Sequence, residues 1–131
     1  MHIGVGEFHR SQQALYLDDY FHQNPGSDWG ICGVELLDSD YDRRMRDALG
    51  SQDCLYTLVA RSPKSDRARI IGSITQYLFA SNNRQAVIQA IANPECRIVT
   101  LTITEMALSA SALALQGIAK FNLLRINEIL Y

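Results

Sequence analysis

The spacing of hydrophobic and polar positions predicts a βαβ unit in the first part of the chain. Residues 2–6 form a short apolar strand that runs into glycines, and residues 29–34 form a continuous apolar run suited to a buried parallel strand. Between them, residues 10–21 repeat apolar side chains at helical spacing, and a polar turn at residues 24–27 ends this helix. The order strand, glycine turn, helix, turn and strand is that of one βαβ unit.

The pattern then changes to a hairpin followed by another helix and strand. The predicted elements are a helix at residues 42–49, hairpin strands at 55–60 and 68–74, a helix at 84–92 and a strand at 97–104. Together these elements predict an α/β fold, with a Rossmann-like, mainly parallel sheet and flanking helices. The sheet is incomplete, and the β-hairpin is inserted before its fourth main strand. Residues 106–116 are small and helix-prone, Gly117 interrupts them, and residues 121–131 have an amphipathic pattern.

Composition narrows the class of protein. The chain has 131 residues, 47% of them hydrophobic, which is typical of one globular domain. The net charge of -2 gives no basic face for nucleic acid, and no apolar run is long enough to cross a membrane. The three cysteines have no C-x-x-C spacing, so we expect reduced thiols in a cytoplasmic protein and no metal site.

Two glycines indicate a candidate binding site for a phosphate group. Gly4 and Gly6 stand between a predicted strand and a predicted helix, where backbone N–H groups and the helix dipole favour the pyrophosphate of a dinucleotide. The third glycine of the usual G-x-G-x-x-G pattern would fall at His9. A tight turn between strand and helix without a ligand is the alternative interpretation.

An acidic residue after the second strand is expected to bind the ribose hydroxyls of an NAD cofactor. The candidates are Glu35, Asp38, Asp40 and Asp42. We favour Asp38, the first acid after the apolar pair Leu36-Leu37. Arg43 and Arg44 are also close in sequence, and an arginine there could pair instead with the 2′-phosphate of NADP. Each acid could also simply begin the next helix, whose N-terminus is its positive end.

The turn Gly4-Val5-Gly6-Glu7-Phe8-His9-Arg10 and several later stretches carry a family resemblance. They are residues 13–18, 29–34, 45–49, 52–58 and 99–105. Over roughly residues 1 to 105 the chain resembles the mannitol dehydrogenase family, whose G-x-G-x-F-x-R turn accounts for His9. The sequence departs from that family at Glu35, where a glycine is usual, and in a lengthened loop at residues 38–41.

The resemblance implies an NAD-binding site and a hydride transfer between NAD(H) and a sugar alcohol, ketose or sugar acid. It implies a cofactor site made by Gly4, Gly6, Glu7, Phe8, Arg10, Asp38, Thr102 and Thr104. In the family, a helical C-terminal domain supplies the catalytic lysine, asparagines and histidine. We find no counterpart here, since Lys64 lies in a polar turn and Lys120 in the tail. We therefore expect no catalytic residue and no activity from this chain alone.

The expected organisation is a partial Rossmann-type NAD-binding domain at residues 1–105 and a helical tail at residues 106–131 that does not match the family. An incomplete sheet leaves an exposed edge through which copies can associate. The alternative is a non-enzymatic remnant or association module that keeps the fold with a vestigial nucleotide site.

Overall fold

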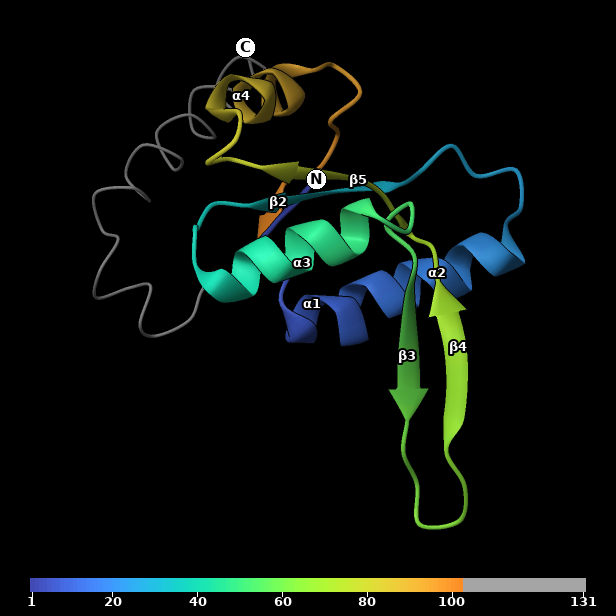
Figure 1. The fold of residues 1–131 in the computed structure, drawn as a ribbon. Helices are drawn as coiled ribbons and strands as arrows, with labels where there is room; N and C mark the ends of the chain where they lie inside the picture. Colours follow the sequence, from blue (N-terminus) through green and yellow to red (C-terminus); the bar gives the residue numbers. More distant parts are fainter. Residues whose placement is uncertain (103–131) are drawn as a thin grey trace.

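The computed structural model describes residues 1–102 of the chain, which form an open α/β sheet with helices on both faces (Figure 1). Thr104 and residues 106–131, for which sequence predictions were made, lie outside this part. The elements in chain order are β1 (His2–Ile3), α1 (Glu7–Ser11), α2 (Gln13–Gln23), β2 (Ile31–Glu35), α3 (Asp40–Gly50), β3 (Tyr56–Ala60), β4 (Arg67–Ile71), β5 (Ile74–Phe79), α4 (Arg84–Ala92) and β6 (Thr100–Leu101).

The main sheet has four parallel strands in the order β5-β2-β1-β6. The chain moves outward from β1 to β2 and β5, and then returns to β6 on the far side of β1. Because parallel crossovers are right-handed, this reversal places α4 on the opposite face from α1, α2 and α3, as Figure 1 shows. The predicted fold class, a Rossmann-like and mainly parallel sheet, is therefore confirmed.

A hydrophobic cluster lies on each face of the sheet. On the α1–α3 face, Val5, Ala14 and Leu49 pack with residues of β2 and β5. On the α4 face, Ile3, Val34 and Val87 form the second cluster. Val34 is fully buried because β2 is covered on both faces, as its continuous apolar run predicts. Both clusters hold the carboxyl ends of β1 and β2 in a fixed position.

The inserted hairpin of β3 and β4 is antiparallel, forms a sheet of its own and projects from the body of the protein (Figure 1). Its base is attached to α2 by Asp18, whose buried carboxylate accepts the Gly72 N–H at 2.8 Å and binds the guanidinium of Arg69. Arg69 also binds Asp19 at 2.6 Å. The predicted hairpin is present and has a polar anchor at its base.

One strand of the main sheet is missing from the sequence prediction. The predicted hairpin strand at residues 68–74 is two elements, because the chain leaves β4 at Gly72 and enters β5 at Ile74. The Ser73 carbonyl accepts the N–H of Ile31 at 2.9 Å, which joins β5 to β2. The parallel partner of β2 is therefore the segment that follows the apparent hairpin strand.

The predicted bounds of two helices and one strand also differ from those in the structure. The first helix begins at Glu7 rather than at residue 10 and is interrupted at Gln12. The second begins at Asp40, because Ser39 and Asp42 form a reciprocal capping box that stabilises an earlier start. In the last strand, predicted at residues 97–104, only Thr100 and Leu101 of the described residues pair with β1.

Candidate functional site

The turn after β1 needs a glycine at position 4. Gly4 has φ +89°, a region that side chains with a Cβ rarely adopt. Its N–H donates to the Val34 carbonyl at 2.8 Å, and a Cβ here would lie 3.4 Å from the Thr102 carbonyl oxygen. Gly4 therefore lies at the carboxyl ends of β1, β2 and β6, the edge where open α/β sheets bind ligands.

Gly6 differs, because the fold itself does not require a glycine there. It is the N-cap of α1 with φ -77° and ψ -176°, and a Cβ at Gly6 would have no atom within 4 Å. No side chain caps the helix at this position. The N-terminus of α1 thus has no side-chain cap, and the space beside Gly6 leaves room for an anion to approach.

Arg10 fastens the turn to the protein body. Its Nη1 donates to the Val5 carbonyl at 2.8 Å and contacts Met45 Sδ at 3.2 Å. The hydroxyl of Tyr56 donates to the Arg10 carbonyl at 2.6 Å. These contacts give Arg10 a positioning role in the turn, and its predicted contact with a cofactor stays a prediction.

Glu7 and Phe8 are exposed in the first turn of α1. The Phe8 side chain is 71% exposed and lines a hollow beside α2 instead of packing in the core. Only the backbone N–H groups of these two residues lie at the helix start, so any contact with a phosphate would come from the main chain.

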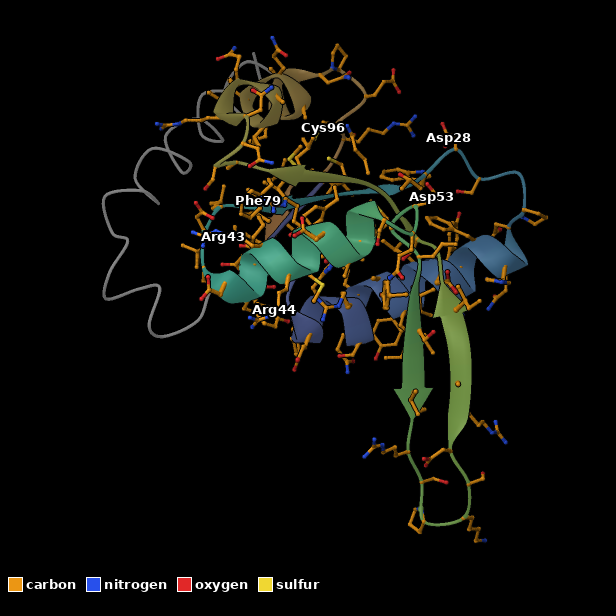
Figure 2. All side chains as sticks on the ribbon, viewed as in Figure 1. Asp28, Arg43, Arg44, Asp53, Phe79 and Cys96 are labelled. Carbon is orange, nitrogen blue, oxygen red and sulfur yellow. The ribbon has the colours of Figure 1, made fainter. Side chains whose placement is uncertain are left out.

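The candidate ribose acids have different environments. Asp38 lies three residues after β2 and accepts a hydrogen bond from Arg43 Nε at 2.7 Å, and about half of its side chain is exposed. Asp40 is exposed and binds the same arginine at 3.0 Å. Asp42 is buried and belongs to the capping box of α3. Figure 2 shows Arg43 at the same end of the sheet as Phe79, the last residue of β5.

Glu35 is the last residue of β2 and is half-buried. Burial, and secondly the nearby charge of Asp42, raises the pKa of its carboxyl group. The structure thus brings Gly4, Gly6, Glu35 and Thr102 to one edge of the sheet, with Asp38 in the loop that follows β2. Thr102 is adjacent to Gly4, and its N–H donates to the Ile3 carbonyl at 3.0 Å.

A pair of stacked histidines, missed in the sequence analysis, supports the glycine turn. The rings of His2 and His9 are 3.7 Å apart and nearly parallel. His2 Nε2 donates to the Gly4 carbonyl at 3.2 Å, and its Nδ1 lies 2.8 Å from Thr100 Oγ1. His9 is 1% exposed, and neither of its ring nitrogens has a hydrogen-bond partner within residues 1–102.

The same pair is held in the neutral form. Burial is the main cause that lowers the pKa of His9 to about 3, and the neighbouring His2 and Arg10 lower it further. Burial also lowers the pKa of His2. Alternation along β1 could have indicated that His2 points inward, but no local signal marks His9 as buried.

A hollow of about 680 Å³ lies beside β6. Its lining is mostly apolar and includes several exposed large side chains: Phe8, Tyr16, Tyr20, Trp29 and Ile98. Arg97 lies over the Trp29 ring and binds Asp28 at 2.9 Å. Figure 2 shows Asp28 at the end of the molecule opposite to Arg43.

The family model for the mannitol dehydrogenase Rossmann domain matches residues 1–130 of the chain. The chain belongs to the mannitol dehydrogenase family. The mannitol 2-dehydrogenases of Neosartorya fischeri and of Aspergillus fumigatus strain Af293 are both 53% identical to it over 105 residues. A mannitol dehydrogenase of Saccharomyces cerevisiae is 49% identical over 105 residues. These alignments cover 80% of this chain, which spans about one fifth of the relatives' length.

Two solved dehydrogenase structures have the same fold over the matched part of the chain. A substrate-free D-sorbitol dehydrogenase superposes with a TM-score of 0.72 at 36% identity, covering 81% of this chain and 22% of that enzyme. The Pseudomonas fluorescens mannitol 2-dehydrogenase, solved as a ternary complex with NAD and D-mannitol, superposes with a TM-score of 0.69 at 48% identity. That superposition covers 79% of this chain and 21% of the enzyme. The family resemblance found in the sequence is confirmed.

Residues 1–102 contain neither a membrane-spanning helix nor a cluster of metal-ligating side chains. None of the helices there has the length and hydrophobicity needed to cross a membrane. No group of three or more His, Cys, Asp or Glu side chains in that part is arranged to hold a metal ion. Cys32, Cys54 and Cys96 are free thiols.

Proposed function

We propose that this chain is the NAD-binding portion of a mannitol dehydrogenase-like oxidoreductase. The full-length enzyme would transfer hydride between NAD(H) and a sugar alcohol, ketose or sugar acid, and it would act in the cytoplasm. The proposal is supported by family membership and by one observation in the site. Gly6 is a glycine that the fold does not need, at the open N-terminus of a helix.

The residues at this edge fit a dinucleotide. The main chain of Gly4, Gly6, Glu7 and Phe8 would approach the pyrophosphate, while Arg10 keeps the turn in place through the Val5 carbonyl. Thr102, and Thr104 outside the described residues, would border the ribose or nicotinamide. When bound, the nicotinamide ring supplies the hydride acceptor or donor. This chain's own contribution is to bind and orient it.

Asp38 is the proposed partner of the adenosine ribose. Its carboxylate lies just beyond β2, where NAD-dependent folds place an acid that accepts from the ribose hydroxyls. Arg43 is already paired with Asp38 and Asp40, which partly neutralises the cation that a 2′-phosphate would require. The arrangement therefore favours NAD over NADP.

Titration of NADH fluorescence tests the cofactor site. A Gly6→Val variant should fold, because its backbone angles suit any residue and its Cβ meets nothing, yet it should bind NADH at least about tenfold more weakly because the side chain blocks the phosphates. Gly26→Val is the matched control, since Gly26 also has open space and lies in a turn after α2. Equal NADH binding by the wild type and Gly6→Val would refute the site.

We further propose that the chain alone is inactive, with a partial cofactor domain at residues 1–105 and a separate helical tail at residues 106–131. The described residues contain one lysine, Lys64, and it is exposed in the loop of the hairpin. No proton-transferring lysine therefore stands near the candidate site within residues 1–102. Measurable turnover of mannitol or fructuronate with NAD(H) by this chain would contradict this proposal.

A second candidate function is association with a second copy. The hollow beside β6 carries large exposed side chains, and such apolar patches mark interaction sites in soluble proteins. On this view the nucleotide site is vestigial and the fold is kept for association. An experiment can distinguish the two functions. The first predicts NADH binding, whereas the second predicts a persistent dimer that does not bind NADH.

A further inference from the structure

Glu35 lies on the side of β2 that faces the glycine turn. Side chains alternate along a strand, so Gly33 and Glu35 share one face. On that face a Cβ at Gly33 would lie 2.8 Å from Val5 Cγ2, while the Gly4 N–H donates to the adjacent Val34 carbonyl. The turn therefore packs on the last residues of β2, and the carboxylate of Glu35 follows directly on the side where Val5 lies.

Three main-chain N–H groups partly offset the burial that raises the pKa of the Glu35 carboxyl group. Glu35 Oε1 accepts the Leu36 N–H at 3.1 Å, and the N–H groups of Leu37 and Val5 also favour the charged form. The Val5 N–H belongs to the turn that is proposed to receive the pyrophosphate. The negative charge of Glu35 thus lies close to the turn where the negatively charged pyrophosphate is expected to bind.

The other groups around Glu35 do not cancel this charge completely. Asp42 of α3 adds a second negative charge, and the buried hydroxyl of Tyr77 on β5 is close to both acids. Tyr41 and the cation of Arg10 also influence Tyr77, but Arg10 directs its Nη1 to the Val5 carbonyl. The side chains around Glu35 therefore carry more negative than positive charge.

We propose that the Glu35 carboxylate is an internal anion that competes with a dinucleotide pyrophosphate at the glycine turn and weakens its binding. Two like charges at one turn repel each other, and the repulsion is poorly screened in a half-buried position. This inference rests on the proposed NAD-binding function. It makes Glu35 a residue that limits affinity, distinct from the acid that binds the ribose.

A Glu35→Gln variant tests the inference, because glutamine keeps the shape and removes the charge. At pH 7.5, NADH should bind Glu35→Gln about fivefold more tightly than the wild type, as expected for the loss of one nearby like charge. Glu35→Ala should show the same direction, which guards against a local effect of the new amide. Glu95→Gln, an exposed acid before β6, is the control of equal charge change and should leave the affinity unchanged.

Amide NMR provides a readout that does not depend on NADH. The Val5 amide signal of the wild type should shift as Glu35 is protonated on acidification, and this shift should be absent from Glu35→Gln. The inference would be overturned if Glu35→Gln had unchanged NADH affinity, or if the pH dependence of the Val5 amide signal were the same in both proteins. Weaker NADH binding would make Glu35 a ribose ligand and would also overturn it. If neither protein binds NADH while the Val5 amide titrates as expected, the proposed function has failed and the inference falls with it.

Discussion

At the scale of single residues, the stacked rings of His2 and His9 beneath the glycine turn make the stability of the fold depend on pH. Because the pKa of His9 is lowered from 6.5 to about 3, the folded protein keeps this ring neutral at a pH where the unfolded chain protonates it. The resulting stability is fully present above about pH 6.5 and is lost progressively as the pH falls toward 3. His2, whose pKa is also lowered, acts in the same direction.

A substitution at His9 tests this coupling. Between pH 7 and 5 the wild type should lose about 2 kcal/mol of unfolding free energy through His9, since 1.5 pKa units separate pH 5 from the ordinary value. His9→Phe keeps a flat ring against His2 and cannot titrate, so its loss over this range should be smaller by that amount. Urea denaturation at both pH values measures the difference. Parallel losses in the two proteins would show that His9 does not carry the pH dependence.

The candidate site was only partly predictable from single residues. Gly4 and Gly6 could be identified because a turn between strand and helix has a local signature. The sequence also contains four candidate acids, of which Asp38 was favoured only for its place after Leu36-Leu37, and the structure shows how their environments differ. Asp42 is used in a helix cap, Asp38 is held by Arg43, and Glu35 faces the turn. These roles depend on which elements pack together, which no short window of sequence contains.

At the scale of elements, the position of the hairpin depends on a buried carboxylate. Asp18 of α2 is 3% exposed and accepts hydrogen bonds from Arg69 and from the Gly72 N–H, whereas Asp19 binds the same arginine from a half-exposed position. These contacts connect the first crossover helix to the end of β4. They explain how a projecting hairpin keeps a fixed base.

Neutralising each acid in turn separates the two contacts. Asp18→Asn should lower the unfolding free energy by about 1–3 kcal/mol, because it leaves a buried network without its charge. Asp19→Asn should change it by less than about 0.5 kcal/mol, as expected for an exposed ion pair. Urea denaturation gives both values, and hydrogen exchange of the β3 and β4 amides should rise mainly in Asp18→Asn. Equal effects of the two substitutions would rule out a special role for the buried carboxylate.

The elements themselves were predictable where their signal was local. The helix at residues 84–92 has the bounds of α4, because Asn83 caps its first turn and Pro94 lies beyond its end. β5 was missed because its first residue continues the apolar run of β4 across Gly72 and Ser73. The break between them is imposed by the hydrogen bond from Ile31 to Ser73, a long-range contact. Tertiary pairing, not local propensity, decides such a boundary.

At the scale of the whole molecule, β6 is the edge strand of the sheet within residues 1–102 and pairs with β1 on one side. The hollow next to it is lined by aromatic and aliphatic side chains, of which Tyr16 is 64% and Ile98 is 56% exposed. The proposed partner of this surface is a second copy of the chain.

Self-association through this surface should therefore depend on concentration. Light scattering coupled to size exclusion should show wild-type dimers that dissociate on dilution, and Tyr16→Asp with Ile98→Asp should shift the protein to monomer, because burying a carboxylate in an apolar contact is costly. Ile70→Asp is the matched control: Ile70 is 65% exposed, but it lies on the projecting hairpin and not in the hollow. A monomeric wild type at all concentrations, or a dimer that only Ile70→Asp disrupts, would refute this surface as the contact. If the monomeric double variant still binds NADH as the wild type does, association and cofactor binding are independent properties of the chain.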